Sequence, residues 1–393
     1  MTAIFMPYWG ADIAMATGML RVIGLMSGTS LDGVDAAFVE TDGRRVGRRG
    51  ASLSLPYDSA LREAIYGLFA RAPDLPHDDP ALCEVERALT DIHAEAVRRI
   101  LAVEGGADLV GFHGQTICHA PRRGVSWQIG DAIRLSGAVG LPVIHDFRSA
   151  DVRAGGEGAP LAPWYHAACL DGRQGPVAIL NIGGVANITF VGRDGSVLAG
   201  DTGPGNALLD DWALRHTGIA CDRDGALARA GRVDSARLHD LLAHDFFRRP
   251  LPKSLDRQDF IASLETLSPL SPEDGAATLV AMTVHAIART QLPEPPTAWF
   301  VCGGGRHNPS IMAALASRLP GRVSPVEALG WNGDMLEAEC FAFLAARALR
   351  GLPLSSPGIT GAPRLSSGGR LSSAGIALPE SFLSSGTILG IAR

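Results

Sequence analysis

Glycine and hydroxyl side chains gather near the start of the sequence, in the segment Met-Ser-Gly-Thr-Ser-Leu-Asp-Gly-Val-Asp at 26–35. Small residues leave backbone N–H groups accessible, and Ser and Thr add hydroxyls, so the segment offers the donors that a polyphosphate needs. Asp32 and Asp35 supply carboxylate oxygens that could hold a hydrated Mg²⁺. The same residue types are common in ordinary hairpin turns, which stay the alternative interpretation.

A second candidate is Asp201, the first residue of Asp-Thr-Gly-Pro-Gly-Asn at 201–206. We expect this carboxylate at the end of a strand, beside a rigid turn and a helix that starts at Ala207. A carboxylate held in this way is suited to act as a general base. A helix cap followed by a tight turn would leave the same pattern.

Three consecutive glycines follow an apolar run in Cys-Gly-Gly-Gly-Arg-His-Asn-Pro at 302–309. Glycine lets a flat group such as adenine or ribose approach the backbone closely, whereas a purely structural turn is the alternative. Histidines His113, His119, His145 and His166 match no zinc-binding spacing. We expect His113 at a strand end, where a polar contact with a ligand is plausible.

Glu337 lies in a predicted helix over 334–349. At 100° per residue a helical wheel places it on the apolar face, between Phe341 and Leu344, with Glu339 toward the opposite edge. A carboxylate on an apolar face costs free energy unless it is paired or functional. Glu337 is therefore the better candidate for a site residue.

Composition excludes several classes of function. The 393 residues carry a net charge of −6 with no long run of one sign, which argues against a nucleic-acid or anionic-membrane surface. Lys253 is the only lysine, and the sequence contains no Walker A motif, which would need one. Six scattered cysteines without a CxxC motif are expected to be reduced, mostly buried thiols of a cytoplasmic protein.

Two segments share one pattern of apolar runs around a glycine turn. The runs 21–26 and 34–39 flank the first turn, and the runs 177–181 and 185–191 flank Gly183 and Gly184. Each predicts a β-hairpin, and together they suggest two similar half-domains. Alternating helices and strands elsewhere predict an α/β fold with one buried sheet in each half. We expect the tail after Gly361, rich in Ser and Gly, to be irregular.

These segments together resemble the anhydro-N-acetylmuramic acid kinase family, from Gly24 to about Gly361. Matching segments are 24–35, His-Gly-Gln-Thr (113–116), Gln-Ile-Gly-Asp (128–131), Asp-Phe-Arg (146–148), Gly-Gly-Glu-Gly-Ala-Pro-Leu (155–161), Asn-Ile-Gly-Gly-Val-Ala-Asn (181–187) and 201–206. The resemblance implies a two-lobed hexokinase/actin-like (ribonuclease H-like) α/β fold with ATP in the cleft between the lobes. The family's closing strand pattern is lost after Gly361.

The implied activity is ATP-dependent hydrolytic opening of 1,6-anhydro-N-acetylmuramic acid with phosphorylation of O6, in cell-wall recycling. Asp201 matches the family's catalytic aspartate, with Glu337 as a possible support for the water or the sugar hydroxyls. Arg148 is expected to pair with the lactyl carboxylate, and His113 to contact the sugar. Asp32 and Asp35 would hold Mg²⁺ through water. The expected nucleotide-binding residues are Gly28, Thr29, Ser30, Leu31, Asp32, Gly33, Val34, Asp35, Gly183, Gly184, Gly203, Gly303, Gly304, Gly305 and Asn308.

We expect residues 1–20 to be a loose extension, 21–145 the N-terminal lobe, 146–350 the C-terminal lobe, and 351–393 a return segment with an irregular tail. A homodimer without membrane or nucleic-acid partners is also expected. Two alternative functions remain. A glycosidase could use Asp201 and Glu337 without nucleotide, and a non-catalytic regulator could have kept only the binding of sugar or nucleotide.

Overall fold

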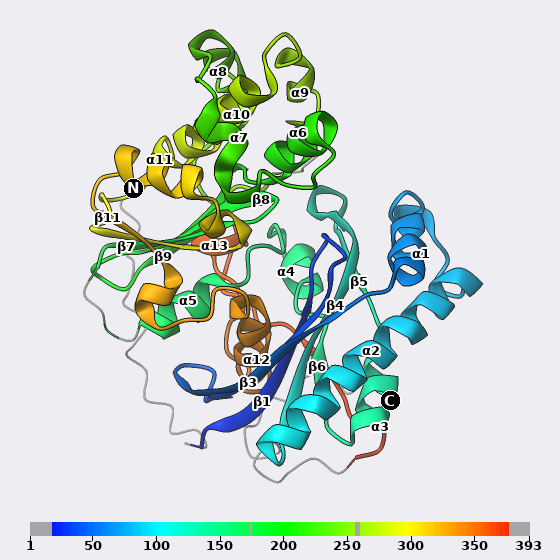
Figure 1. Ribbon diagram of the computed structural model, residues 1–393. Helices are drawn as coiled ribbons and strands as arrows, with labels where there is room; N and C mark the ends of the chain where they lie inside the picture. Colours follow the sequence, from blue (N-terminus) through cyan, green and yellow to red (C-terminus); the bar gives the residue numbers. More distant parts are fainter. Residues whose placement is uncertain (1–17, 171, 173–174, 256–259, 377–393) are drawn as a thin grey trace. The chain divides into compact units, whose positions relative to one another are not determined.

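The computed structural model describes residues 18–170, 172, 175–255 and 260–376. The chain divides into two compact units (Figure 1). Among the described residues, the first unit contains 18–170 and 335–376, and the second contains 172–334. The chain thus passes between units near 171 and 334, whereas the sequence suggested boundaries at 145 and 350.

The first unit is built on a sheet that has seven strands among the described residues, in the order β12-β6-β4-β1-β2-β3 with β5 beside β4. Its strands are β1 (Leu20–Ser27), β2 (Gly33–Thr41), β3 (Val46–Pro56), β4 (Leu109–Ala120), β5 (Val125–Ile129), β6 (Val143–His145) and β12 (Arg370–Ser372). Its helices are α1 (Ser59–Phe69), α2 (Pro80–Glu104), α3 (Ala132–Val139), α4 (Ser149–Arg153), α5 (Pro163–Leu170), α12 (Leu336–Leu349) and α13 (Pro357–Thr360), with 3₁₀ turns η1 (Ala72–Asp74) and η2 (Pro121–Arg123).

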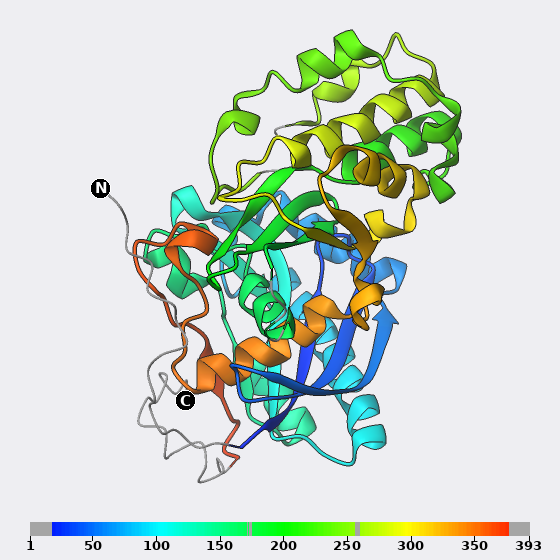
Figure 2. The ribbon, with the colours of Figure 1, turned by 90° about the vertical axis from the view of Figure 1, so that its left-hand side faces the viewer.

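The predicted first hairpin is confirmed, because β1 and β2 pair antiparallel from Leu20↔Thr41 to Met26↔Asp35. Alternate side chains of these strands point to opposite faces of the sheet. Ile23 and Leu25 enter an apolar core with residues of α2, which ends at the left-handed Gly105. Helix α12 lies against the sheet's other face (Figure 1, Figure 2).

Two glycines let α12 approach that face closely. A Cβ at Gly24 of β1 would lie 1.9 Å from the carbonyl oxygen of Ala338, and one at Gly111 of β4 would lie 2.2 Å from that of Phe341. Real Cβ atoms do not come so near to backbone oxygen. The position of α12, which carries Glu337, therefore depends on the absence of side chains at both points.

Gly24→Ala is expected to lower the free energy of unfolding by about 1–3 kcal/mol or more, because α12 must move away from the sheet. Gly67→Ala in α1 is the control, since nothing lies within 4 Å of its Cβ position. That change should stabilise the helix by about 0.5–1 kcal/mol. Urea denaturation of both variants measures the difference, and equal stabilities would contradict the close packing of α12.

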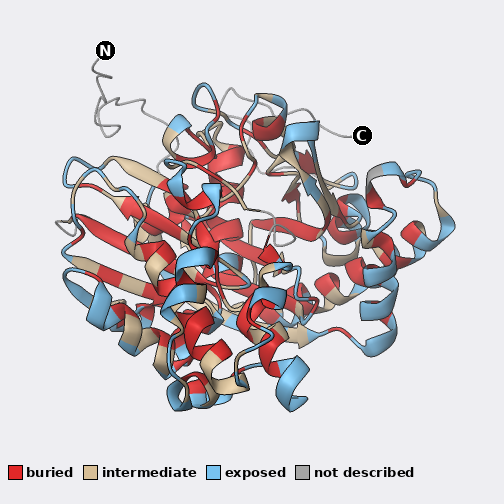
Figure 3. Ribbon diagram, turned by 90° about the horizontal axis from the view of Figure 1, so that it is seen from above, coloured by how far each residue is buried: buried red, intermediate tan, exposed pale blue. Residues whose placement is uncertain are grey.

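The described residues of the second unit form a five-stranded sheet in the order β11-β10-β7-β8-β9. Its strands are β7 (Val177–Ile182), β8 (Val185–Val191), β9 (Val197–Pro204), β10 (Ala298–Cys302) and β11 (Arg322–Pro325). Its helices are α6 (Ala207–Thr217), α7 (Ala226–Ala230), α8 (Ser235–Leu241), α9 (Ser263–Thr266), α10 (Pro272–Ala288) and α11 (Pro309–Arg318), with 3₁₀ turns η3 (Arg223–Gly225), η4 (Asp245–Arg248), η6 (Gly304–His307) and η7 (Val326–Leu329). Most residues of these strands are buried. In Figure 3 buried residues (red) run along the strands of the ribbon, whereas many exposed residues (pale blue) lie on helices and loops.

Both sheets share one connectivity. In each sheet three consecutive strands pair antiparallel, β1–β3 in the first unit and β7–β9 in the second. A later strand, β4 or β10, pairs parallel with the first of the three. A further strand, β6 or β11, then pairs parallel with β4 or β10. The second hairpin, β7–β8, is therefore confirmed as well. This repeated order is that of the ribonuclease H-like fold, so the predicted fold class is confirmed.

Four predicted local features differ from the structure. His113 lies inside the long strand β4 and not at a strand end, and Asp201 lies inside β9. The tail after Gly361 is not wholly irregular, because Arg370–Ser372 forms β12 and pairs antiparallel with β6. The expected loose extension 1–20 includes Leu20, the first residue of β1, while residues 1–17 lie outside the described part of the chain.

The six cysteines are free thiols, as expected, but they are not mostly buried. Only Cys302 and Cys340 are buried, and Cys221 is exposed. None of the helices in the described ranges combines the length and the apolar character needed to cross a bilayer.

Candidate active site

The turn between β1 and β2 is built so that its polar residues face outward. The amide of Leu31 donates to the carbonyl of Gly28 at 3.2 Å and closes the turn. Thr29 and Ser30 are exposed, whereas the Leu31 side chain is buried with φ at 59°, an uncommon conformation for a bulky residue. Within the described part of the chain the amides of Thr29 and Ser30 donate no hydrogen bond. The turn can therefore receive an anionic group.

Not all predicted nucleotide-binding residues of this hairpin can use their side chains. Leu31 and Val34 are buried in the first unit's core. A Cβ at Gly33 would lie 2.1 Å from the carbonyl oxygen of Leu55, so that glycine is needed for the packing of β3. At Gly28, by contrast, the nearest atom to a Cβ would be 3.5 Å away, so its surface is open.

Asp32 and Asp35 lie on the same hairpin and provide oxygen ligands of the kind that Mg²⁺ prefers. Asp32 is exposed, and Asp35 accepts a hydrogen bond from Ser54 Oγ at 2.5 Å. The described ranges contain no group of three or more His, Cys, Asp or Glu side chains that could hold a metal ion. The binding of Mg²⁺ through water by Asp32 and Asp35 therefore stays a prediction.

The glycines predicted near the nucleoside have different roles. A Cβ at Gly303 would lie 2.4 Å from Asn181 Oδ1, and a Cβ at Gly305 would lie 2.4 Å from Ile182 Cγ2. Both glycines are therefore needed for close packing against β7. At Gly304 the nearest atom would be 3.5 Å away, so this surface is open. Gly183 and Gly184 are similarly open, with the nearest atoms at 3.6 Å.

Two other predicted nucleotide residues have structural roles in the second unit. The Asn308 side chain caps α11 by accepting hydrogen bonds from the amides of Ser310 and Ile311. A Cβ at Gly203 would lie 2.9 Å from Phe247. These contacts account for both residue types without a ligand.

Asp201 is held by a segment that follows it by about fifty residues. Its amide donates to the carbonyl of Lys253 at 2.8 Å, and its Oδ2 accepts from the amide of Leu255 at 2.8 Å. Lys253 Nζ donates to the carbonyl of Phe246 at 2.9 Å, and burial lowers the pKa of this lysine to about 8. The Asp201 carboxylate is half-buried and fixed in direction, as a general base requires.

Two asparagines that sequence reasoning left without a role lie beside Asp201 in the sheet. Asn181, Asn187 and Asp201 are directly paired across β7, β8 and β9. Paired residues of antiparallel strands point to the same face. Their signal was the motif at 181–187, which begins and ends with asparagine.

His113 and Arg148 are in direct contact in the first unit. His113 is buried, and its Nε2 accepts hydrogen bonds from Arg148 Nε at 3.2 Å and Nη2 at 3.0 Å. Burial, and secondarily the charge of Arg148, holds the pKa of His113 well below its usual range. A neutral imidazole therefore orients the guanidinium.

Arg148 is also fixed by Gly158, whose carbonyl accepts from Nη1 at 2.8 Å. Burial lowers the pKa of Arg148, and the negative charge of Glu337 acts in the opposite direction. Arg148 is thus in contact with His113 and lies close enough to Glu337 for the two charges to interact.

The helical-wheel prediction for α12 is wrong. Glu337 is exposed, whereas Glu339 is 4% exposed and accepts hydrogen bonds from Tyr165 and from Arg49, the latter at 3.1 Å. After its first turn α12 is buried on nearly all sides, so a wheel cannot separate an inner from an outer face. Glu339 serves structure, and the exposed Glu337 can still meet a substrate.

Buried histidines should make the protein sensitive to acid. Burial lowers the pKa of both His93 and His166 to about 4, from an ordinary value of 6.5. Only the unfolded chain takes up their protons as the pH falls below 6.5, so the stability present above 6.5 is lost between pH 6.5 and 4. We expect each to cost about 2 kcal/mol of unfolding free energy at pH 5.

Urea denaturation at pH 7.5, 6 and 5 measures this loss. His166→Phe is expected to lower the number of protons taken up on unfolding between pH 6 and 5 by nearly one. An unchanged pH dependence in that variant would show that His166 is protonated in the folded protein.

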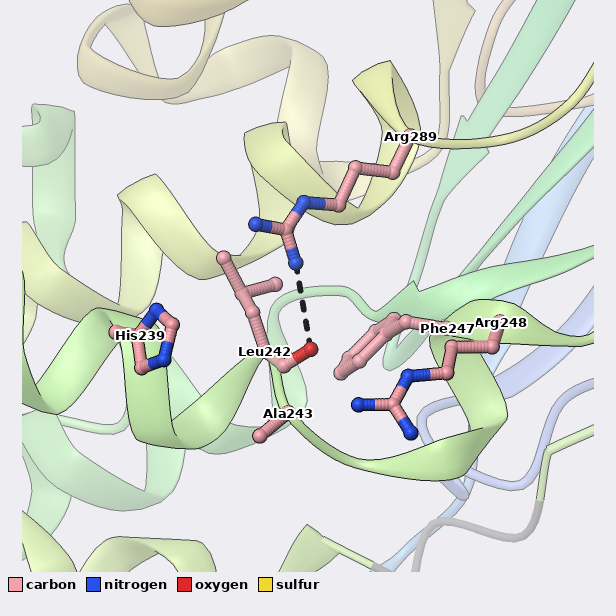
Figure 4. Close-up of a pocket in the computed structure, with 6 residues that line it drawn as sticks. All are labelled: His239, Leu242, Ala243, Phe247, Arg248 and Arg289. Atoms are coloured by element: carbon pink, nitrogen blue, oxygen red, sulfur yellow. Dashed lines mark hydrogen bonds between the residues drawn. The ribbon is translucent and has the colours of Figure 1, made fainter.

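A surface pocket of the second unit is lined by none of the predicted site residues. It is lined by His239, Leu242, Ala243, Phe247, Arg248 and Arg289 (Figure 4). Arg289 Nη1 donates to the carbonyl of Leu242 at 3.3 Å, which ties the end of α10 to the residues after α8. This bond gives the arginine a structural role.

Comparisons with known proteins match most of the chain. A family model described as anhydro-N-acetylmuramic acid kinase matches residues 20–374. The chain belongs to this family. It is 57% identical over 353 residues to an anhydro-N-acetylmuramic acid kinase of Acidiphilium cryptum, covering 90% of this chain and 98% of the relative. A relative of the same name from Rhodospirillum rubrum is 51% identical over 362 residues, covering 91% and 96%.

A search of solved structures finds more distant proteins. A ROK family glucokinase from Streptomyces griseus, in complex with glucose and AMPPNP, aligns with a TM-score of 0.38 at 13% identity. The alignment covers 83% of this chain and 99% of the glucokinase. The assignment to the anhydro-N-acetylmuramic acid kinase family rests on the sequence matches.

Proposed function

We propose that the chain opens the 1,6-anhydro bond of anhydro-N-acetylmuramic acid with water and transfers the γ-phosphate of ATP to O6, in cell-wall recycling. The products are N-acetylmuramate 6-phosphate and ADP. Membership of the kinase family supports this activity, since the match spans residues 20–374. Asp201 and Arg148, two of the family's motif residues, are each held by hydrogen bonds to neighbouring groups.

Asp201 is assigned as the general base. It accepts a proton from water as the water oxygen attacks C1, and the C1–O6 bond breaks. O6 then attacks the γ-phosphorus, the bond to ADP breaks, and no separate acid is needed for O6 because phosphorus takes the proton's place. The Leu255 amide and the backbone bond to Lys253 support this role by keeping the carboxylate in one orientation.

The turn from Gly28 to Leu31 is assigned to the nucleotide phosphates. Its exposed Thr29 and Ser30 and its amides provide neutral donors, which agrees with the absence of a Walker A lysine. Asp32 and Asp35 would hold Mg²⁺ through water, and the ion would neutralise charge on the phosphates. The open surfaces of Gly183, Gly184 and Gly304 are assigned to the rest of the nucleotide.

Arg148 is assigned to the lactyl carboxylate of the sugar. Of its five N–H groups, Nε and one on each terminal nitrogen are engaged by His113 and Gly158. One N–H therefore remains on each terminal nitrogen for the carboxylate, and we expect the two to bind it in bidentate geometry. Glu337 lies near Arg148 and is assigned to the sugar hydroxyls or the attacking water.

The reaction can be tested with purified protein, the anhydro sugar, Mg²⁺ and ATP in ¹⁸O-water, followed by mass spectrometry at short times. The proposed route places one ¹⁸O on C1 and none in the sugar phosphate group. Sugar opening without ATP would instead support the glycosidase alternative. Label in free phosphate without sugar product would indicate simple ATP hydrolysis, and either result would overturn the proposal.

Gly28→Val tests the phosphate assignment. The change meets no close neighbour, so we expect little effect on melting temperature, but the new side chain covers the turn. The KM for ATP should rise about tenfold or more, as expected when one or two charge-assisted hydrogen bonds are lost. Gly67→Val on α1 is the control, and an unchanged KM for ATP in Gly28→Val would contradict the assignment.

We further propose that the protein acts in the cytoplasm as a homodimer. This extends the family resemblance. Sedimentation equilibrium of the purified full-length chain gives the oligomeric state directly.

A further inference from the structure

A fully buried histidine connects helix α2 to the beginning of the turn between β1 and β2. His93 has 0% exposure, and its Nδ1 lies 2.8 Å from the carbonyl oxygen of Leu89, one turn earlier in α2. Its Nε2 lies 2.8 Å from Ser27 Oγ. Ser27 is the last residue of β1 and is itself 1% exposed.

The proton positions in this chain of contacts follow from the partners. A carbonyl oxygen only accepts, so Nδ1 of His93 carries the hydrogen. Burial lowers the pKa of His93 to about 4, so at neutral pH the ring is neutral and Nε2 has a lone pair. The Ser27 hydroxyl therefore donates to His93. Its proton points into the protein and is not available to a ligand.

A second bond holds the next residue of the turn. The carbonyl of Gly28 accepts from Gln115 Nε2 of β4 at 3.2 Å, in addition to the Leu31 amide. Consecutive residues at the start of the turn are thus fixed to two different elements, α2 and β4. This support is relevant because the turn contains Leu31 with a positive φ, a backbone conformation that persists only when its surroundings enforce it.

The environment of Ser27 is polar on several sides and closed to water. The Tyr57 hydroxyl is buried beside Ser27 without a well-formed hydrogen bond, and burial raises the pKa of this tyrosine. The His93 ring packs edge-on against Phe112, with ring centroids 4.9 Å apart. A hydroxyl in such surroundings would cost free energy if its histidine acceptor were lost.

We propose that His93 is a positioning residue for the nucleotide phosphates: by accepting the Ser27 hydroxyl proton it fixes the start of the Gly28–Leu31 turn, so that Thr29 and Ser30 present their amides and hydroxyls in one arrangement. This inference rests on the proposed function, in which the turn binds the phosphates of ATP. His93 itself does not touch the nucleotide.

The test uses His93→Phe, which removes both ring nitrogens but keeps an aromatic ring against Phe112, and Ser27→Ala, which removes only the hydroxyl. Each is expected to raise the KM for ATP about five- to tenfold, the usual effect of one buried hydrogen bond. The KM for the sugar should stay within about twofold and kcat within about threefold. The double variant should be no worse than the worse single variant, because both remove the same bond.

Two further variants separate positioning from general stability. His93→Gln places an amide oxygen near the position of Nε2, and we expect it to restore most of the ATP affinity. His166→Phe is the matched control, a buried histidine of the same unit with a pKa lowered in the same way. It should lower stability without changing the KM for ATP.

The outcomes are distinguishable. If Gly28→Val raises the KM for ATP but neither His93→Phe nor Ser27→Ala does, the positioning role is overturned and the phosphate site stands. If none of the three alters it, the phosphate assignment itself is wrong and the positioning role falls with it. A parallel rise in both KM values with a loss of kcat would show a merely structural histidine and would also overturn the proposal.

Discussion

Replacing Asp201 with asparagine is expected to lower turnover by about 10²- to 10⁴-fold, equal to roughly 3–5 kcal/mol of barrier. Asparagine keeps the size of the side chain and can still accept a hydrogen bond from the Leu255 amide, so the local structure should persist. It cannot take a proton from water. The dissociation constant for ATP should change little, because the proposed phosphate contacts come from the turn at Gly28–Leu31.

The measurement is the turnover rate, the dissociation constant for ATP and the melting temperature of the same protein. Asp194→Asn is the matched control, an aspartate in the turn between β8 and β9 whose carboxylate accepts from the Ser196 amide. It should keep full turnover. Retention of more than about a tenth of wild-type turnover in Asp201→Asn would contradict the general-base role. Loss of stability and of ATP binding together would indicate a structural aspartate.

Both hairpins could be predicted because the information lies within short segments. In β1–β2 and β7–β8, apolar strands meet at a turn containing glycine, and the pairing partners are close in sequence. Strand β12 could not be predicted in this way. Arg370–Ser372 has only one apolar side chain, and its partner β6 lies more than 200 residues earlier, so no local pattern marks it.

The comparison of Glu337 with Glu339 shows the limit of a helical wheel. Such a wheel assumes one buried and one solvated face. Helix α12 is buried nearly throughout, because Gly24 and Gly111 allow one side to lie on the sheet while α5 contacts it elsewhere. The wheel selects Glu337 for a burial that the structure does not show, since Glu337 is exposed.

Sequence reasoning found the polar motifs but could not divide their residues between ligand binding and packing. Gly303 and Gly304 are consecutive glycines with different roles. A side chain at Gly303 would collide with Asn181, whereas the surface at Gly304 is open to a ligand. The contact between His93 and Ser27 spans 66 residues and joins a helix to a strand end. Such roles depend on tertiary neighbours, and a single sequence does not contain them.

Arg148→Lys is expected to raise the KM for anhydro-N-acetylmuramic acid by about 10- to 100-fold. Lysine has no planar fork, so it loses the bonds to His113 and Gly158 and cannot hold a carboxylate through two N–H groups. The positive charge is kept, so the effect measures geometry and not charge. Arg153→Lys is the matched control, because Arg153 is the last residue of the short helix α4, which begins directly after Arg148, and Arg153 is exposed.

A substrate that lacks the lactyl group identifies what Arg148 recognises. Wild-type protein should use 1,6-anhydro-N-acetylglucosamine with a much higher KM, since the carboxylate is missing. Arg148→Lys should then add little further loss, because the interaction that it removes is already absent. If Arg148→Lys instead raises the KM by the same factor for both sugars, the guanidinium acts by holding His113 and Gly158 in place. The assignment of the lactyl carboxylate to Arg148 would then be wrong.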